Sequence, residues 1–450
     1  MYKRFIKTLP FALLASSTTC ISSLSTSSCS PVVTNYKKLT EKLIEIENLQ
    51  GISGLLGWDE MTMLKDGGVD ARNDQKAYLS GVIQEKQTSV ELKTILLSIE
   101  KDYINSNELS NFDKANIRDA IRDYDMATKK SKELAMKEAK LSGEAYGAWV
   151  KAKTADDFAI FAPKLQEIVE IKKEIASVTF PNLSLYDANI ENFERGMVSS
   201  RINEIFTSIK PSIVKLIKDI SLSKVKMEYV CPEALKGSSK WDLENQKLLC
   251  LEIAEAIGFD FQKGRLDVSP HPFTGGPHAT DVRITTRYSE ENWLEGIAGT
   301  VHEVGHALYE QGRPIETQNN LPVSRALSMG IHESQSLFWE RNVFQSKEFW
   351  EFLTPKIHKF FPHTKDVTAE EFYLYCNQVS PGFIRVDADE VTYPLHIVLR
   401  FELEQGLFGD LKVDDLPTVW NKKVKDMLGL TVTSDKVGVL QGIIIDHRSL

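Results

Sequence analysis

The stretch TVHEVGHALYEQG, residues 300–312, places two histidines four residues apart, with a glutamate directly after the first. Apolar residues recur every three to four positions around it, which predicts a helix. On a helix, His302 and His306 project to one side, one turn apart, as two zinc ligands require. Glu303 then lies close enough to take a proton from an attacking water molecule. The pattern indicates a zinc-hydrolase helix; the alternative is a chance match in an ordinary amphipathic helix.

The flanking residues predict where this helix begins and ends. Ser289 is the expected N-cap, followed by Glu290 and Glu291 in the first turn, where the helix dipole favours acidic side chains. Gly312 and Pro314 mark the expected end of the helix. The stripe expected to be buried consists of Trp293, Ile297, Val301, Val304 and Leu308.

A zinc site of this kind needs a third protein ligand, and spacing alone leaves several acids open. Glu333 lies beyond the motif on a second expected helix, SRALSMGIHESQSLFWERNVF, residues 324–344. A carboxylate on a helix that packs against the first would complete the site. The competitors are Glu310, Glu316 and Glu340.

The composition of the whole chain limits its class. The 450 residues carry a net charge of −9, and 42% are hydrophobic and 26% charged, which is typical of a globular protein. An acidic chain without a long basic run argues against nucleic acid as a partner. No apolar run approaches the ~18 residues of a membrane-spanning helix, so none is expected. The five scattered cysteines include no C-x-x-C pair, so neither a disulfide framework nor a cysteine zinc site is indicated.

Most of the chain has a helical pattern. From residue 36 to about 180, apolar residues recur at helical spacing, first in the stripe of Leu39, Leu43, Ile46 and Leu49. Prolines and glycines interrupt residues 259–288, and there DVRITTRY, residues 281–288, alternates like a half-buried strand. Helices are expected again after it. All nine histidines lie at or beyond His271, so imidazole chemistry belongs to the C-terminal part.

The beginning of the chain differs in charge from the rest. No acidic residue precedes Glu41. The same segment contains lysine, arginine, the apolar run FALLA at 11–15 and many Ser and Thr residues. This composition predicts a targeting segment over residues 1–34, secretory or organellar, followed by one domain over 35–450. The alternative is a disordered tail without an address on a cytoplasmic protein.

Several motifs occur together in an order that one family shares. They are GWDEMTM at 57–63, HPF at 271–273, DVRIT at 281–285, HEVGH at 302–306, HESQ at 332–335 and IRVDADEVTYPLHIVLR at 384–400. With these motifs the chain, from about residue 36 to about 441, resembles the carboxypeptidase Taq family, thermostable zinc carboxypeptidases of largely helical fold. GWDEMTM itself is interpreted as structural.

The resemblance implies a ligand set and an activity. His302, His306 and Glu333 would bind Zn²⁺, with Co²⁺ fitting similar sites, and Glu303 would be the general base. The implied enzyme is a homodimer that releases single amino acids from peptides with a free C-terminal carboxylate. The rivals are an endopeptidase or dipeptide-releasing enzyme with the same zinc site, and an inactive relative that serves as a binding module.

A carboxypeptidase must hold a free carboxylate, which arginine does bidentately. Arg385 matches the arginine of the family's I-R-x-x-A-D-E motif and is the expected anchor, with Arg283, Arg287 and Arg400 as substitutes. The last two are more readily interpreted as structural ion pairs.

Further roles at the site are expected as well. His271, Tyr393 and His396 are candidates to donate hydrogen bonds to the tetrahedral oxyanion, although a residue of each kind is more often a packed core residue. His332 could support the ligand shell from its place beside Glu333. The strand at 281–286 is expected at the edge of the cleft, where it could pair with an extended peptide.

The expected fold is mainly α: a large helical, two-lobed single domain with a deep active-site cleft and a small β-sheet at the cleft edge.

The chain departs from the family pattern at its C-terminal end. The family continues with G-x-x-Q-D-x-H-W, whereas this chain has Gly442 where aspartate is expected. We interpret the end as truncated or misjoined, with apolar residues from Val437 to Ile445 left uncovered, which predicts poor solubility and weak activity.

Overall fold

The computed structural model describes residues 30–224, 229–236 and 241–442. Most of the expected targeting segment, 1–34, and the apolar run from Ile443 onward therefore lie outside the described residues. The first helix begins at Pro31, ahead of the domain boundary expected at residue 35. Proline suits the first helical position, because its φ is already helical and its missing N–H would have no partner there.

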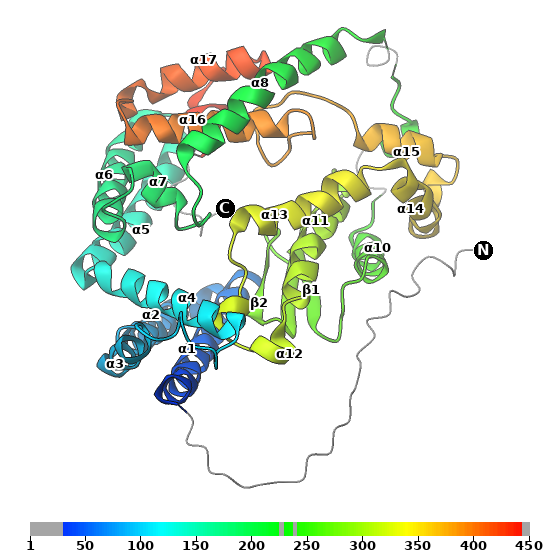
Figure 1. Ribbon diagram of the computed structural model, residues 1–450. Helices are drawn as coiled ribbons and strands as arrows, with labels where there is room; N and C mark the ends of the chain where they lie inside the picture. Colours follow the sequence, from blue (N-terminus) through cyan, green and yellow to red (C-terminus); the bar gives the residue numbers. More distant parts are fainter. Residues whose placement is uncertain (1–29, 225–228, 237–240, 443–450) are drawn as a thin grey trace, which may run out of the picture.

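The N-terminal helices form one end of the molecule (Figure 1). Leu39, Leu43 and Ile46 are buried against the helices that follow, as their spacing predicted, whereas Leu49 is only half-buried. The helices are α1 (Pro31–Thr62), α2 (Val69–Gln87), α3 (Val90–Ile99) and α4 (Asn111–Lys129).

A second group of helices surrounds the largest hydrophobic cluster. Val439 and Leu440 are 3% and 1% exposed within this cluster, so the expectation that this apolar segment is uncovered is wrong for these two residues. The carbonyl of Leu440 also accepts a hydrogen bond from Trp149 Nε1 at 3.1 Å. The helices are α5 (Lys132–Ala155), α6 (Ala162–Thr179), α7 (Leu185–Ile190), α8 (Ser199–Ser221), α16 (Tyr393–Phe408) and α17 (Leu416–Leu428).

A third cluster is built on tryptophan and packs against the helix of the opening motif. The rings of Trp241 and Trp293 stack with centroids 4.3 Å apart, and Trp350 meets Trp293 edge-on. These three side chains are 0–1% exposed. The cluster is surrounded by α10 (Leu243–Ala256), α11 (Trp293–Gln311), α14 (Lys347–Phe360) and α15 (Ala369–Cys376).

The helix of the opening motif, α11, begins later than expected. Asn292, not Ser289, precedes its first residue, and Glu290 and Glu291 lie outside the helix. The hydroxyl of Ser289 accepts hydrogen bonds from the backbone N–H groups of Glu291 and Asn292, which makes a turn before the helix. The expected end at Gly312 is confirmed.

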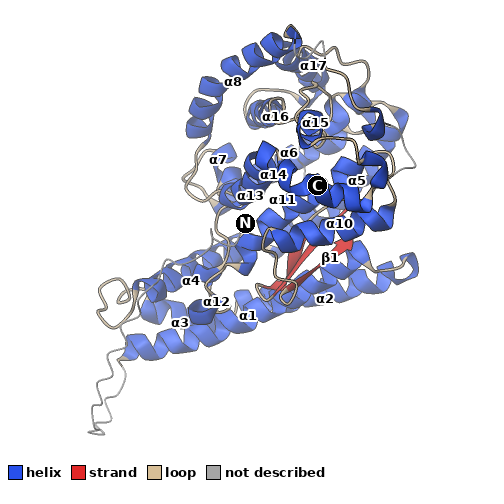
Figure 2. Ribbon diagram, turned by 90° about the vertical axis from the view of Figure 1, so that its right-hand side faces the viewer, coloured by secondary structure: helices blue, strands red, loops and turns tan. Residues whose placement is uncertain are grey.

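A three-stranded sheet lies between α1 and α11 (Figure 2). The strand expected at 281–286 is β3 (Asp281–Thr286), and it is the central strand in the order β1-β3-β2. It pairs in parallel with β1 (Gly264–Val268) and antiparallel with β2 (Thr274–His278). Since both sides of β3 are occupied, the expectation that it pairs with a peptide is wrong. β1 and β2 are the two edge strands.

The structure confirms a mainly α fold with a small sheet. The division into two lobes around a deep cleft stays a prediction. None of the helices in the described ranges is long and apolar enough to span a membrane. Two further helices, α12 (Ile315–Gln318) and α13 (Met329–Leu337), follow α11, and α13 continues into a π-helical segment, Phe338–Phe344.

Candidate metal centre

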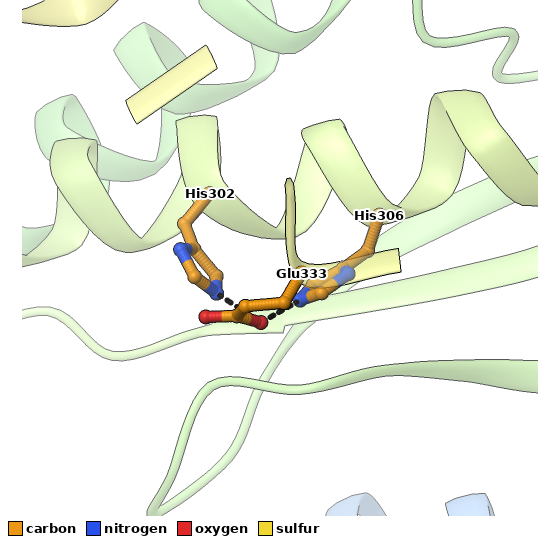
Figure 3. Close-up of side chains that lie close together, drawn as sticks. All are labelled: His302, His306 and Glu333. Carbon is orange, nitrogen blue, oxygen red and sulfur yellow. Dashed lines mark ion pairs between the residues drawn. The ribbon is translucent and has the colours of Figure 1, made fainter. Parts of the chain in front are cut away.

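Two helices bring three side chains together. α11 carries His302 and His306, and α13 carries Glu333, which lies between the two imidazoles (Figure 3). The helices approach closely at Gly305, where a Cβ atom would lie 2.6 Å from Cα of Ser336. Glycine at this position therefore allows the carboxylate of one helix to reach the histidines of the other.

The three side chains present their donor atoms to a common point. Glu333 Oε2 is 3.3 Å from His306 Nε2 and 3.9 Å from His302 Nε2. One donor atom from each residue lies within 4.8 Å of the others. Within the described part of the chain, no other trio of His, Cys, Asp or Glu side chains converges in this way. Two imidazoles and one carboxylate suit the zinc of hydrolytic sites, which leaves positions for water and substrate.

Glu340, one of the competing ligands, lies behind His302 instead. Its Oε2 is 2.7 Å from His302 Nδ1, and its other oxygen is 2.8 Å from Arg341. The π-helical segment that follows α13 carries Glu340, and such segments are frequent at functional sites. A carboxylate that accepts Nδ1–H fixes the tautomer whose Nε2 lone pair faces the metal.

His306 is supported through a second imidazole. Its Nδ1 is 2.6 Å from Nδ1 of His332, and Nε2 of His332 is 2.9 Å from Glu310. If Nε2 of His306 faces a metal, its Nδ1 must carry the proton and donate to His332. His332 then donates from Nε2 to Glu310, whose carboxylate is held by Arg313 at 2.7 Å. Glu310, another competitor, therefore also lies outside the trio.

The charges of the cluster are strongly coupled. Burial lowers the pKa of His302, but the hydrogen bond with Glu340 and the neighbouring carboxylates outweigh it and raise that pKa to about 9. Burial raises the pKa of Glu333, but the hydrogen bond with His306 and the charge of His302 outweigh it and bring the pKa to about 2. Without a metal, these pKa values favour a charged His302 beside ionised Glu333 and Glu340.

Glu303 lies beside this cluster and is 5% exposed. Its Oε2 accepts a hydrogen bond of 2.6 Å from the hydroxyl of Thr274 on β2. Burial raises the pKa of Glu303, and the charge of His302 and the Thr274 hydrogen bond oppose that rise. A buried, oriented carboxylate with a raised pKa is suited to accept a proton and pass it on.

Arg385 lies in the loop between α15 and α16 and is half-buried. No hydrogen bond or ion pair engages its guanidinium within the ranges that the structure describes. Burial raises the pKa of Tyr393, and the charge of Arg385 opposes that rise. Burial and the charge of Arg400 bring the pKa of His396 to about 4. Asp389 orders this loop by accepting hydrogen bonds from the backbone N–H groups of Ser380, Val391 and Thr392.

The other arginines weighed as carboxylate anchors have partners. Arg283 makes two hydrogen bonds to Asp281, at 2.8 and 2.7 Å, and stacks on the buried ring of Trp58, 4.6 Å from its centroid. Arg287 pairs with Glu295. Arg400 is 5% exposed and donates to the carbonyl of His396.

Of the oxyanion candidates, Tyr393 lies beside Arg341, whose guanidinium is 5.4 Å from the centre of its ring and pairs with Glu340. His396 is buried beside Arg400 and Arg385. His271 is exposed in the loop before β2. The structure therefore groups Tyr393 and His396 with Arg385 and leaves His271 at the surface.

Comparisons with known proteins agree with this geometry. The sequence model of the carboxypeptidase Taq (M32) metallopeptidase family matches residues 38–445. The chain belongs to this family. It is 36% identical over 413 residues to carboxypeptidase 1 of Bacillus subtilis, covering 91% of this chain and 80% of that protein. It is 36% identical over 418 residues to thermostable carboxypeptidase 1 of Thermus thermophilus, covering 91% of this chain and 81% of that protein.

Solved structures of M32 carboxypeptidases share the fold. Metallocarboxypeptidase 1 of Trypanosoma cruzi has a TM-score of 0.86 and 32% identity, covering 91% of this chain and 81% of that chain. The M32 carboxypeptidase of Deinococcus radiodurans also has a TM-score of 0.86 and 32% identity, covering 92% of this chain and 81% of that chain. The chain is therefore a metallocarboxypeptidase, a hydrolase of peptide bonds that uses a divalent metal.

The sequence did not reveal the hydrogen-bond partners of Glu303 and His302. Thr274, directly after the HPF motif, was not considered, and Glu340 was weighed only as a ligand. Glu340 follows Glu333 by seven residues, about two helical turns, which places the two on similar sides of a helix and was an available signal.

Proposed function

We propose that the chain is a zinc carboxypeptidase that releases single amino acids from peptides with a free C-terminal carboxylate. The observation that carries the proposal is the convergence of His302, His306 and Glu333 beside the buried carboxylate of Glu303. Zinc is favoured because two imidazoles and one carboxylate match its preferred donors, and cobalt would fit the same set.

The metal, when bound, would supply Lewis acidity that polarises the scissile carbonyl and acidifies water. Glu303 takes the proton of the attacking water at its carboxylate and passes it to the nitrogen of the departing amino acid. The hydroxyl of Thr274 holds one oxygen of that carboxylate. This leaves the other oxygen of Glu303 available for the proton.

The guanidinium of Arg385 would bind the carboxylate of the C-terminal residue. Its lack of an acidic partner in the described ranges supports this role, because a half-buried arginine otherwise gains from pairing. Tyr393, beside the Arg341–Glu340 pair behind His302, is the better-placed donor to the oxyanion, ahead of the buried His396 and the exposed His271. Of the two edge strands, β2 carries Thr274 beside Glu303, and it would align the extended peptide through backbone hydrogen bonds.

Replacement of Glu303 by glutamine tests this assignment. Glutamine keeps the size of the side chain but cannot accept the proton, so kcat should fall by about 10²–10⁴-fold while zinc stoichiometry stays unchanged. The measurements are hydrolysis of an N-blocked dipeptide and zinc content after dialysis. Thr179→Val, which removes a buried hydroxyl far from the centre, is a control for general damage. Near wild-type hydrolysis by the glutamine variant would contradict the assignment.

We also propose that the protein is a homodimer, because of the family relationship. From the basic start of the chain we propose that residues 1–34 target it to an organelle or the secretory route. Sedimentation of the purified protein tests the first proposal. Localisation of a fluorescent protein fused to residues 1–34 tests the second.

A further inference from the structure

The first turn of α13 is held by a loop from a distant part of the chain, the segment between α7 and α8 (Figures 1 and 2). Both oxygens of Glu194 lie 2.7 Å from the hydroxyl of Ser328, the N-cap residue of α13. Glu194 Oε2 also accepts the backbone N–H of Gly330 at 2.9 Å. The carbonyl of Phe193 accepts the N–H of Met329 at 3.1 Å.

These contacts satisfy donors that the helix itself cannot. The first N–H groups of a helix have no intrahelical acceptor. Here Met329 donates to the α7–α8 loop, Gly330 donates to Glu194, and Ile331 donates to Ser328 Oγ at 2.9 Å. Glu194 also places a negative charge at the end of the helix where the dipole favours one. The turn that precedes Glu333 is therefore fixed by Glu194 and not only by α13.

The contacts of Glu194 lie at the first turn of α13, the end at which the helix has no preceding helical turn. Its second half packs on Gly305 of α11, and its first turn rests on Glu194. Glu333 lies between these two supports. A Cβ atom on Gly330 would lie 2.7 Å from Glu194 Oε2, so glycine at this position allows the carboxylate to approach.

We propose that Glu194 is a positioning residue of the metal centre, which holds Glu333 at the distance from His302 and His306 that metal binding requires. This inference rests on the proposed role of Glu333 as a ligand. It assigns to the α7–α8 loop a part in metal affinity, although that loop contributes no ligand.

The test is the dissociation constant of zinc for the full chain, measured by competition with a chromophoric chelator, together with the absorption spectrum of the cobalt-loaded protein. Partners that bond a metal ligand directly typically contribute 10- to 100-fold in affinity, and Glu194 acts on the turn before Glu333, so the low end of that range is expected. Glu194→Ala should weaken zinc binding by about tenfold or more and alter the cobalt spectrum. Glu194→Gln, which keeps an acceptor for Ser328 and Gly330, should stay within about threefold of the parent.

Glu371→Ala is the matched control, because Glu371 completes the N-terminal cap of α15, which carries no ligand. Equal weakening in this control, or parental affinity in Glu194→Ala, would overturn the inference. If Glu194→Ala does not fold, Gly330→Ala perturbs the same contact, and parental zinc affinity in that variant would overturn it too. Parental zinc affinity in Glu333→Ala would instead overturn the proposed role of Glu333 as a ligand, on which this inference rests.

Discussion

Among single residues, Arg385 is the one that we propose selects the carboxylate end of a peptide. Arg385→Ala removes the charge-assisted hydrogen bonds to the substrate carboxylate, which should cost about 2–4 kcal/mol. That corresponds to a loss of about 30- to 700-fold in kcat/KM on free-acid peptides. Steady-state kinetics on a blocked dipeptide measures the loss.

The control for Arg385 is Arg201→Ala, which removes an exposed arginine on α8 that pairs with Glu204. It should leave kcat/KM unchanged. An Arg385→Ala enzyme with parental kcat/KM would contradict the assignment, and Arg283 and Arg400 would have to be reconsidered despite their partners.

The residues of the metal centre were predictable to different degrees. The positions of His302 and His306 follow from helical periodicity, because a spacing of four residues places two side chains on one side. Glu333 could not be separated from Glu310 and Glu340 by spacing, and the family resemblance favoured it. The structure separates them through their partners: Arg313 and His332 hold Glu310, and Arg341 holds Glu340. Such partners come from tertiary contacts.

At the scale of elements, the close packing of α11 on α13 brings the proposed ligands together. In Gly305→Ala the new Cβ would meet backbone atoms of Gln335 and Ser336 at 2.6–3.0 Å, which cannot move independently of α13. We expect a stability loss of about 1–3 kcal/mol together with weaker zinc binding, because the helices must separate. Urea unfolding of the metal-free protein and chelator competition measure the two effects.

Gly299→Ala is the control within the same helix. The nearest atom to its Cβ would be the hydroxyl of Thr286 at 3.3 Å, a side-chain atom, so the substitution should be close to neutral. If Gly305→Ala kept parental stability and zinc affinity, helix proximity would not be what forms the site.

The sheet shows what element prediction from sequence leaves open. The alternation of DVRITTRY predicted β3, and the strand is present. Its place between two neighbours was not predicted, since pairing depends on residues far apart in the chain. Thr285 is buried, and its hydroxyl accepts hydrogen bonds from the hydroxyl of Ser269 and the N–H of Phe273.

For the whole molecule, metal binding and folding should both depend on pH through His302. Its folded pKa of about 9 exceeds the unfolded value of about 6.5. Its charged form therefore stabilises the metal-free fold fully below about pH 6.5, and this contribution is lost as pH rises through about 9. Zinc requires the neutral ring, so its apparent affinity should rise about tenfold per pH unit from pH 7 toward 9.

Chelator competition titrations at several pH values measure this slope. Glu340→Gln removes the main group that raises the pKa of His302, so the slope should flatten above pH 7 in that variant. A zinc affinity that does not change between pH 7 and 9 in the parent would contradict the charge state assigned to His302.

At the same scale, the mainly helical class was predictable because long amphipathic patterns report burial directly. The packing of α1 against β2 was not. It depends on Gly51 and Gly54, where Cβ atoms would lie 2.6 and 3.1 Å from the carbonyl oxygens of Pro277 and Gly276. Neither glycine interrupts the helical pattern of α1, so no local signal shows that another backbone lies against them.

The central claim, metal-dependent release of single C-terminal residues, is tested most directly by a timed digest read by mass spectrometry. One peptide of mixed sequence is supplied as the free acid and as the C-terminal amide, with and without a chelator. We predict that the free acid shortens one residue at a time, that the amide stays intact, and that the chelator stops the reaction until zinc is restored. Internal fragments, losses of two residues at a time, trimming of the amide, or no cleavage by the zinc-loaded protein would contradict the claim.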